Sequence, residues 1–121
     1  MPIEKFEDIK GWQEAQVLVK MIYHLTDEGK LAKDFGLRDQ LRRASVSIMA
    51  NIAEGFDCDS NAEFARFLGI ARRSAVEVQS LLYATLDVGY VGLEQFKSHY
   101  DQASKTKALI SAFKSAMPKK H

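Results

Sequence analysis

The chain carries no proline between Ile3 and Met117, and this freedom from helix breakers constrains its fold more than any other feature. Its two prolines, Pro2 and Pro118, lie close to the ends of the 121 residues. Because proline removes a backbone donor and distorts helix interiors, its absence favours long helices. Hydrophobic residues make up 46% and charged residues 27% of the chain, enough to fill one core and cover its surface. We therefore expect a single domain over residues 1–121.

Apolar residues recur at three- and four-residue steps in four segments, which is the spacing of helices with one buried face. The predicted helices span about 9–27, 37–56, 61–88 and 93–117. The expected apolar faces comprise Trp12, Ala15, Leu18, Val19, Ile22 and Leu25; then Leu37, Leu41, Ala44, Ile48 and Ile52; then Phe64, Phe67, Leu68, Ala71, Ala75, Val78, Leu82 and Leu86; and finally Phe96, Tyr100, Ala103, Leu109, Ile110, Phe113 and Met117.

Turn and cap residues separate these segments. Gly29 and Gly89 favour helix ends, because glycine adopts the left-handed conformation found there. Asp34 is a candidate cap of the second helix, and Ser60 with Glu63 forms a capping box before the third. The links are short, so neighbouring helices run antiparallel, and no segment alternates like a strand. The sequence predicts an all-α, up-down-up-down antiparallel four-helix bundle.

Two glycines lie inside predicted helices, where each costs about 1 kcal/mol relative to alanine. Gly55 lies near the end of the second helix, which indicates a role in termination. Gly69 lies in the middle of the third helix, which favours close contact with a neighbouring helix.

A polar stripe runs beside the apolar face of the second helix, and polar residues on the third helix complement it. The set comprises Gln40, Arg43, Ser47, Asn51, Glu54, Arg66, Ser74 and Glu77. A hairpin turning near residues 57–60 places Gln40 and Arg43 opposite Ser74 and Glu77. It places Asn51 and Glu54 opposite Glu63 and Arg66. Such groups tend to occur in satisfied sets, so we expect a network that fixes register or faces another subunit. A ligand site is the alternative.

Catalytic and metal-binding motifs are missing from the sequence. The histidines His24, His99 and His121 are isolated, and Cys58 is the only cysteine. No glutamate precedes a histidine by three residues, and no glycine-rich phosphate loop occurs. Glu54 and Glu77 lie several helical turns apart, which argues against an acid–base pair. We expect no enzymatic activity, no cofactor and no metal.

No run of about eighteen apolar residues is present to span a bilayer. Acidic residues stand where a secretion signal needs a basic region followed by an apolar run. We expect a cytoplasmic protein without membrane contact.

The net charge is only +1, but it is unevenly distributed. From Lys97 to His121 there are six lysines against a single acid, Asp101. A solvated helix face with a basic tail accounts for this pattern. A contact with RNA or DNA is the alternative, and its candidate residues are Arg42, Arg72, Arg73, Lys105, Lys107, Lys114, Lys119 and Lys120.

Several segments resemble one known family. They are QLRRASVSI at 40–48 and NIAEGF at 51–56, with FARFL at 64–68 and WQEA at 12–15. Over about residues 6–115 the chain resembles the four-helix bundle proteins encoded by 23S rRNA intervening sequences. That resemblance implies a ring-like homopentamer and carries over no catalytic residue. The family is similar to the accessory variability proteins of diversity-generating retroelements, which are strongly basic, bind nucleic acid and partner a reverse transcriptase. A net charge of +1 departs from that pattern.

The leading functional hypothesis is a non-enzymatic, self-assembling scaffold or binding module that forms a homo-oligomer. Apolar residues outside the main faces favour it, namely Val17, Met21, Val46, Met49, Val76 and Tyr83. The alternative is an RNA- or DNA-binding accessory protein whose basic patches repeat around the oligomer. A third hypothesis is a small-ligand bundle in which Asn51, Glu54, Ser74 and Glu77 line a pocket.

Overall fold

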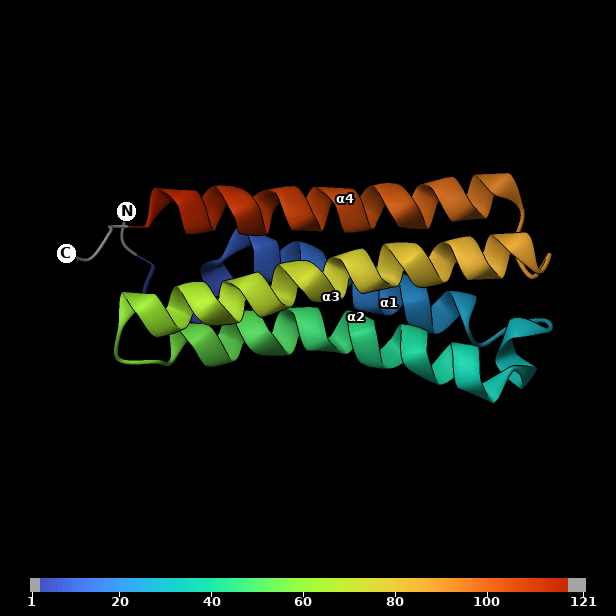
Figure 1. Cartoon of the computed structure of the whole chain (residues 1–121), viewed down its shortest axis with the longest axis horizontal. Coiled ribbons are helices and arrows are strands. Elements are labelled where there is room, and N and C mark those ends of the chain that lie inside the picture. The colour runs from blue at the N-terminus through green and yellow to red at the C-terminus, as the bar shows by residue number, and fades with distance from the viewer. Residues whose placement is uncertain (1–2, 118–121) are drawn as a thin grey trace.

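The computed structural model describes residues 3–117, which form four long antiparallel helices (Figure 1). They are α1 (Lys10–Leu25), α2 (Phe35–Phe56), α3 (Asn61–Asp87) and α4 (Leu93–Ala116). Two short 3-10 helices, η1 (Phe6–Asp8) and η2 (Leu31–Lys33), precede α1 and α2. No strand occurs in this part of the chain. The predicted all-α four-helix bundle is therefore confirmed, and each predicted helix end differs by two residues or fewer.

The four helices form a closed circuit in which each contacts two neighbours. Successive helices pack side by side, and α1 closes the circuit by packing against α4. The α2–α3 pair makes the most extensive contacts. The bundle therefore has four lines of helix–helix contact, here called seams: α1–α2, α2–α3, α3–α4 and α1–α4. The α2–α3 turn lies at one end of the bundle, and the other two connections lie at the opposite end (Figure 1).

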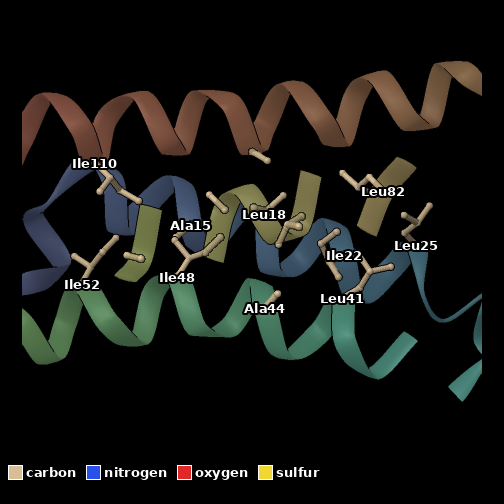
Figure 2. Packing of buried hydrophobic residues seen from close by; sticks show 14 of the residues in the cluster. Ala15, Leu18, Ile22, Leu25, Leu41, Ala44, Ile48, Ile52, Leu82 and Ile110 are labelled. Atoms are coloured by element: carbon tan, nitrogen blue, oxygen red, sulfur yellow. The ribbon is translucent and has the colours of Figure 1, made fainter. Parts of the chain in front are cut away.

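The core follows the apolar faces predicted from the helical period (Figure 2). Leu18, Ile22, Leu41 and Ile48 are completely buried between the helices. Burying a side chain of this size contributes about 1.5–3 kcal/mol. Three core residues were not part of the predicted faces: Ile9, Leu31 and Val91 come from the connecting segments. Within residues 3–117, none of the helices combines the length and apolar character needed to cross a membrane.

One residue of the predicted α4 core is wrong. Leu109 is only half-buried, whereas Thr106 is completely buried. The reason is helical geometry: Ala103, Thr106 and Ile110 share one face of α4, whereas Leu109, one residue before Ile110, is turned about 100° around the helix from it. The hydroxyl of Thr106 donates a hydrogen bond of 2.9 Å to the Gln102 carbonyl, so its burial leaves no unpaired donor.

The predicted caps and turns are present, but the capping box is only half formed, because the Glu63 carboxylate pairs with Arg66 at 2.9 Å instead of reaching back to Ser60. The Ser60 hydroxyl accepts a hydrogen bond from the Glu63 amide at 3.1 Å, and the Asp34 carboxylate accepts one from the Leu37 amide at 3.2 Å. Gly29 and Gly89 have φ values of +62° and +81°, the left-handed conformation that ends helices.

The close helix contact predicted at Gly69 is wrong, and Gly55 allows such a contact instead. A Cβ on Gly55 would lie 2.6 Å from Phe67 Cβ and 2.8 Å from the ring of Phe64, so this glycine allows α2 and α3 to approach. A Cβ on Gly69 would meet only the Lys114 ammonium, at 3.6 Å, which is an ordinary contact. The close approach lies near the hairpin turn, where the two helices first meet.

Candidate functional site

A line of polar contacts joins α2 to α3 along their seam. Arg43 Nη2 donates to Glu77 Oε2 at 2.7 Å. One helical turn along, the hydroxyls of Ser47 and Ser74 lie 3.0 Å apart. Asn51 Nδ2 donates to the Ser47 carbonyl at 2.8 Å and to its hydroxyl at 3.0 Å. Five residues of the predicted polar set thus lie along one seam, as an Arg43–Glu77 pair and a separate hydrogen-bonded group of Ser47, Asn51 and Ser74.

The register of this hairpin differs from the prediction. Arg43 meets Glu77 as predicted, but Ser74 bonds Ser47, which lies one helical turn after Arg43 and two turns after Gln40. The physical reason is side-chain direction. Helical side chains lean toward the N-terminus of their own helix, so a surface point is covered by a residue about one position further along each chain. In an antiparallel pair the two displacements add and shift the contacts.

The other three predicted members take no part in these contacts between α2 and α3. Gln40 and Glu54 are exposed, and the Arg66 guanidinium pairs with Glu63 at 2.9 Å within α3 rather than with Asn51 or Glu54 on α2. A partner three residues away on the same helix needs no tertiary alignment, which explains this choice. In residues 3–117 no buried side-chain nitrogen or oxygen lacks a hydrogen-bond partner. The polar seam is therefore satisfied internally, as a structural network requires.

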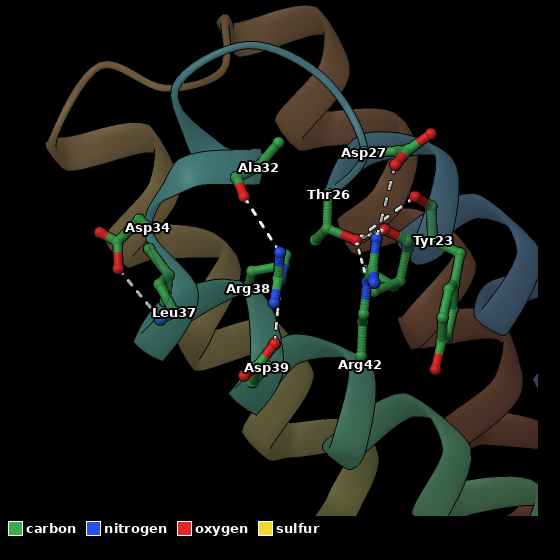
Figure 3. A network of polar contacts seen from close by, with 10 residues as sticks. Tyr23, Thr26, Asp27, Ala32, Asp34, Leu37, Arg38, Asp39 and Arg42 are labelled. Carbon is green, nitrogen blue, oxygen red and sulfur yellow. Dashed lines mark hydrogen bonds and ion pairs between the residues drawn. The ribbon is translucent and has the colours of Figure 1, made fainter.

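Arg42 is held at the end of the bundle where α1 meets α2 (Figure 3). Its Nε donates to the Thr26 hydroxyl at 2.7 Å, and its guanidinium carbon lies 4.5 Å from the centre of the Tyr23 ring. Asp27 lies 4.0 Å from Nη2. A cation stacked on an aromatic ring and bonded to a buried hydroxyl connects two helices. The structure thus gives Arg42, a candidate for nucleic-acid contact, an internal role.

Asp34 connects the two loops at this same end. One oxygen caps α2 through the Leu37 amide, and the other accepts a hydrogen bond of 3.0 Å from the Tyr90 hydroxyl in the α3–α4 connection. This hydrogen bond raises the pKa of Tyr90, because it stabilises the protonated phenol. Arg38 donates to the Ala32 carbonyl of the α1–α2 connection at 3.2 Å (Figure 3).

Three of the predicted nucleic-acid candidates lie along the α3–α4 seam, and we call them the basic seam: Arg72, Lys107 and Lys114. Arg72 Nε donates to the Ser111 hydroxyl at 3.0 Å, and Lys107 Nζ donates to Gln79 Oε1 at 3.3 Å. Arg72 and Lys114 line one open hollow of about 500 Å³ together with Ser111 and Ser115. The neutral partners hold Arg72 and Lys107 in place without neutralising their charge.

The surroundings of the basic seam lack negative charge. No acid occurs in residues 64–76 of α3 or in residues 102–117 of α4. Glu63 and Glu77 flank the α3 stretch, but each is paired with an arginine away from the seam, Arg66 and Arg43 respectively. A chain with a net charge of +1 thus presents a local positive surface.

The remaining basic candidates lie elsewhere. Arg73 is exposed beside Arg72, whereas the Lys105 ammonium lies 3.5 Å from the Glu14 carboxylate across the α1–α4 seam. Lys119 and Lys120 lie outside the described residues. The structure therefore divides the predicted basic set instead of forming one patch from it.

Two polar contacts that hold α4 were not predicted. Gln79 is almost completely buried, and its Nε2 donates to the Ser104 hydroxyl at 2.8 Å. Gln102 Nε2 donates to the carboxylate of Glu14 at 2.9 Å. The signal for Gln79 is its position, four residues after Ala75 and three before Leu82 on the apolar face. In residues 3–117 no group of three or more potential ligand side chains could hold a metal ion.

The fold and these contacts define a class: an all-α four-helix bundle whose polar side chains mostly tie helices together. The sequence model of the 23S rRNA-intervening sequence protein family matches residues 7–112, and the chain belongs to this family. A solved structure of a protein of unknown function, from the S23 ribosomal protein family of Bacteroides thetaiotaomicron, is similar to it. The two share 27% identity and a TM-score of 0.74, over 88% of this chain and 96% of the other. Neither description names a catalytic activity. No curated protein matches the chain.

Proposed function

We propose that this protein is a non-enzymatic scaffold that assembles with copies of itself into a homo-oligomeric ring. The observation that carries the proposal is the exposure of apolar side chains in the middle of helices. Val17 is 41% exposed on α1, and Val46 is 38% exposed on α2. A small bundle has no need of valines at such positions unless another surface covers them.

These two valines lie on two different faces that share α1. Val17 lies between Glu14 and Met21, both of which contact α4. Val46 lies four residues after Arg42, which contacts α1. In a ring each subunit touches its two neighbours through different faces set at an angle to each other. The α1–α2 and α1–α4 seams supply such a pair of faces.

Charged substitutions at the two valines test this assembly. Val17→Glu and Val46→Glu each place a carboxylate in an apolar contact, which favours separate subunits. Each variant is expected to have a lower mass by light scattering than the natural chain. Gln40→Glu, an exposed change on α2, is the matched control and keeps the natural mass. Unchanged masses for both valine variants, with the helical circular dichroism intact, contradict these contact faces.

A second candidate function is the binding of RNA or DNA, and the basic seam favours it. Arg72, Lys107 and Lys114 lie in an acid-free region, and a ring repeats this region in every subunit. Repetition allows a modest charge per chain to act at several phosphates at once.

A fluorescence titration with labelled structured RNA, single-stranded DNA and duplex DNA tests this function. Binding through phosphates is expected to weaken steeply between about 50 and 200 mM salt. Replacing Arg72, Lys107 and Lys114 together with glutamate abolishes the binding. The matched control replaces the exposed Lys10, Lys30 and Lys33 with glutamate and retains it. The absence of binding at the lower salt, or equal effects of the two triple variants, rejects the basic seam.

A further inference from the structure

Three aromatic rings cluster on the same seam as the basic residues. The ring centre of Tyr83 lies 4.7 Å from that of Phe96 and 5.7 Å from that of Tyr100, and the last two centres are 5.3 Å apart. Phe96 is only 8% exposed, whereas Tyr83 is 48% exposed. Phe96 therefore supports the two tyrosines from below, and Tyr83 presents much of its ring to solvent.

The cluster continues the line of the basic seam. Tyr83 follows Arg72 by eleven residues, or about three helical turns, so both lie on the side of α3 that faces α4. The contacts of both residues confirm this placement: Arg72 bonds Ser111 of α4, and Tyr83 packs against Tyr100 of α4. The distance along the helix is roughly 16 Å, which is the length of about five stacked nucleotides.

Lys107 lies between the two ends of this line. Its ammonium is bonded to Gln79, which is itself bonded to Ser104, so the cation is fixed at the middle of the seam. The surface thus presents cations at one end and in the middle, and an open aromatic face at the other end. This arrangement carries two separate kinds of recognition, charge and stacking.

We infer that the α3–α4 seam binds a single strand of nucleic acid, with phosphates on the basic seam and a base stacked on Tyr83. This inference rests on the second candidate function. In a duplex the bases are stacked on each other, so their faces are not accessible to an aromatic side chain of the protein. In a single strand they are open, so a base can stack on an aromatic side chain. An aromatic face in line with cations therefore distinguishes single strands from duplexes. An acidic peptide would use the cations but has no base for the ring.

The test compares probes of about 12 nucleotides, a length within the range of single-strand sites. The probes are oligothymidine, an abasic strand of equal length and a duplex of equal length. The variants are Tyr83→Leu, which removes the ring, and Tyr83→Phe, which keeps it. Tyr23→Leu makes the same change at an exposed tyrosine on α1 and is the matched control. Circular dichroism establishes that each variant is folded.

We expect the natural chain to bind oligothymidine more tightly than the abasic strand or the duplex. Tyr83→Leu weakens the binding of oligothymidine about tenfold and leaves the other two probes unchanged. Tyr83→Phe and Tyr23→Leu bind like the natural chain. Equal affinity for the three nucleic-acid probes means recognition by charge alone, and so does equal affinity for a polyglutamate peptide. Either result overturns the inference about the single strand, while the proposed nucleic-acid binding stands. Failure of every nucleic-acid probe to bind at about 50 mM salt removes both.

Discussion

Gly55 sets how closely α2 and α3 approach near their turn. A methyl group at this position would lie 2.6 Å from the Cβ of Phe67, and a Cβ atom cannot rotate out of the way. Phe64 lies on the same side and contacts Phe113 of α4, with ring centres 5.6 Å apart. A single hydrogen atom in place of a side chain thus permits the packing of three helices at this end of the bundle.

Replacing this glycine is predicted to destabilise the fold. Gly55→Ala forces α2 and α3 apart, and overpacking of this kind costs about 1–3 kcal/mol. Gly69→Ala, the matched control, meets only an ordinary contact and gains helix propensity, so it is neutral or more stable by up to about 1 kcal/mol. Urea unfolding midpoints of the two variants measure the difference. A Gly55→Ala protein as stable as the Gly69→Ala protein contradicts the close approach.

Glu14 shows how a single side chain ties α1 to α4 and responds to pH. The hydrogen bond from Gln102 lowers the pKa of Glu14; partial burial opposes this effect, and the positive charge of Lys105 adds to it. The folded state therefore favours the ionised carboxylate. Its contribution to stability is present above the unfolded pKa of about 4.3, and it is lost as the pH falls through the lower folded value.

Removing the amide of Gln102 is predicted to raise the pKa of Glu14. In Gln102→Ala the carboxylate keeps Lys105 but loses its strongest partner, so the pKa moves up toward its ordinary value. A carbon-detected NMR titration of the Glu14 carboxyl measures the shift. Gln95→Ala, an exposed change on the same helix, serves as the control and leaves this titration as it is. The same Glu14 pKa in both variants would rule out Gln102 as the cause.

At the scale of elements, caps determine where the helices begin. The Ser60 hydroxyl accepts the hydrogen bond of the Glu63 amide at the start of α3, and Asp34 does the same for α2. The Glu63 carboxylate pairs with Arg66 in the first turn of α3. The two caps give hydrogen-bond acceptors to backbone amides that have no partner within the helix at its start.

Loss of the Ser60 cap is predicted to destabilise the protein by about 1 kcal/mol. In Ser60→Ala the Glu63 amide loses its acceptor at the start of a helix that contacts both α2 and α4. Thermal unfolding followed by circular dichroism measures the loss. Ser80→Ala, an exposed change inside α3, is the control, and its melting temperature does not fall. A cap without effect would show up as equal melting temperatures for the two variants.

Helix ends and most core residues are predictable from the sequence because their causes are local. Gly89 ends α3 through its own backbone conformation, and the apolar steps of each helix identify its buried face. Thr106 is one exception, because its hydroxyl can be buried only when it donates a hydrogen bond to the carbonyl of Gln102. A residue type alone does not reveal such a bond.

Partners in the candidate site are less predictable because they depend on tertiary alignment. The register of α2 against α3 decides whether Ser74 meets Arg43 or Ser47, and sequence spacing does not include the lean of the side chains. Arg42 and Lys105 carry the positive charge expected of nucleic-acid contacts. In the bundle, however, Arg42 bonds Thr26 and Lys105 lies beside the Glu14 carboxylate. Only the packed bundle separates these residues from Arg72 and Lys114.

At the scale of the whole molecule, the four seams differ in chemistry. The α2–α3 seam carries the hydrogen-bonded pairs Arg43–Glu77 and Ser47–Ser74. The α3–α4 seam carries uncompensated cations and the open ring of Tyr83. The two seams that border α1 carry the exposed side chains of Val17 and Val46, and α3 carries the exposed Val76. One bundle thus presents two faces suited to its own copies and one suited to a polyanion.

Self-assembly of the chain is measured without any variant through the molar mass of the purified protein. Size-exclusion chromatography with light scattering at micromolar concentration measures that mass without any label or variant. We expect a single species that contains several chains. The ring implied by the family resemblance has a mass of about five times the 13.6 kDa of one chain. A mass of 13.6 kDa under these conditions would contradict the account, because the exposed valines would then have no covering surface.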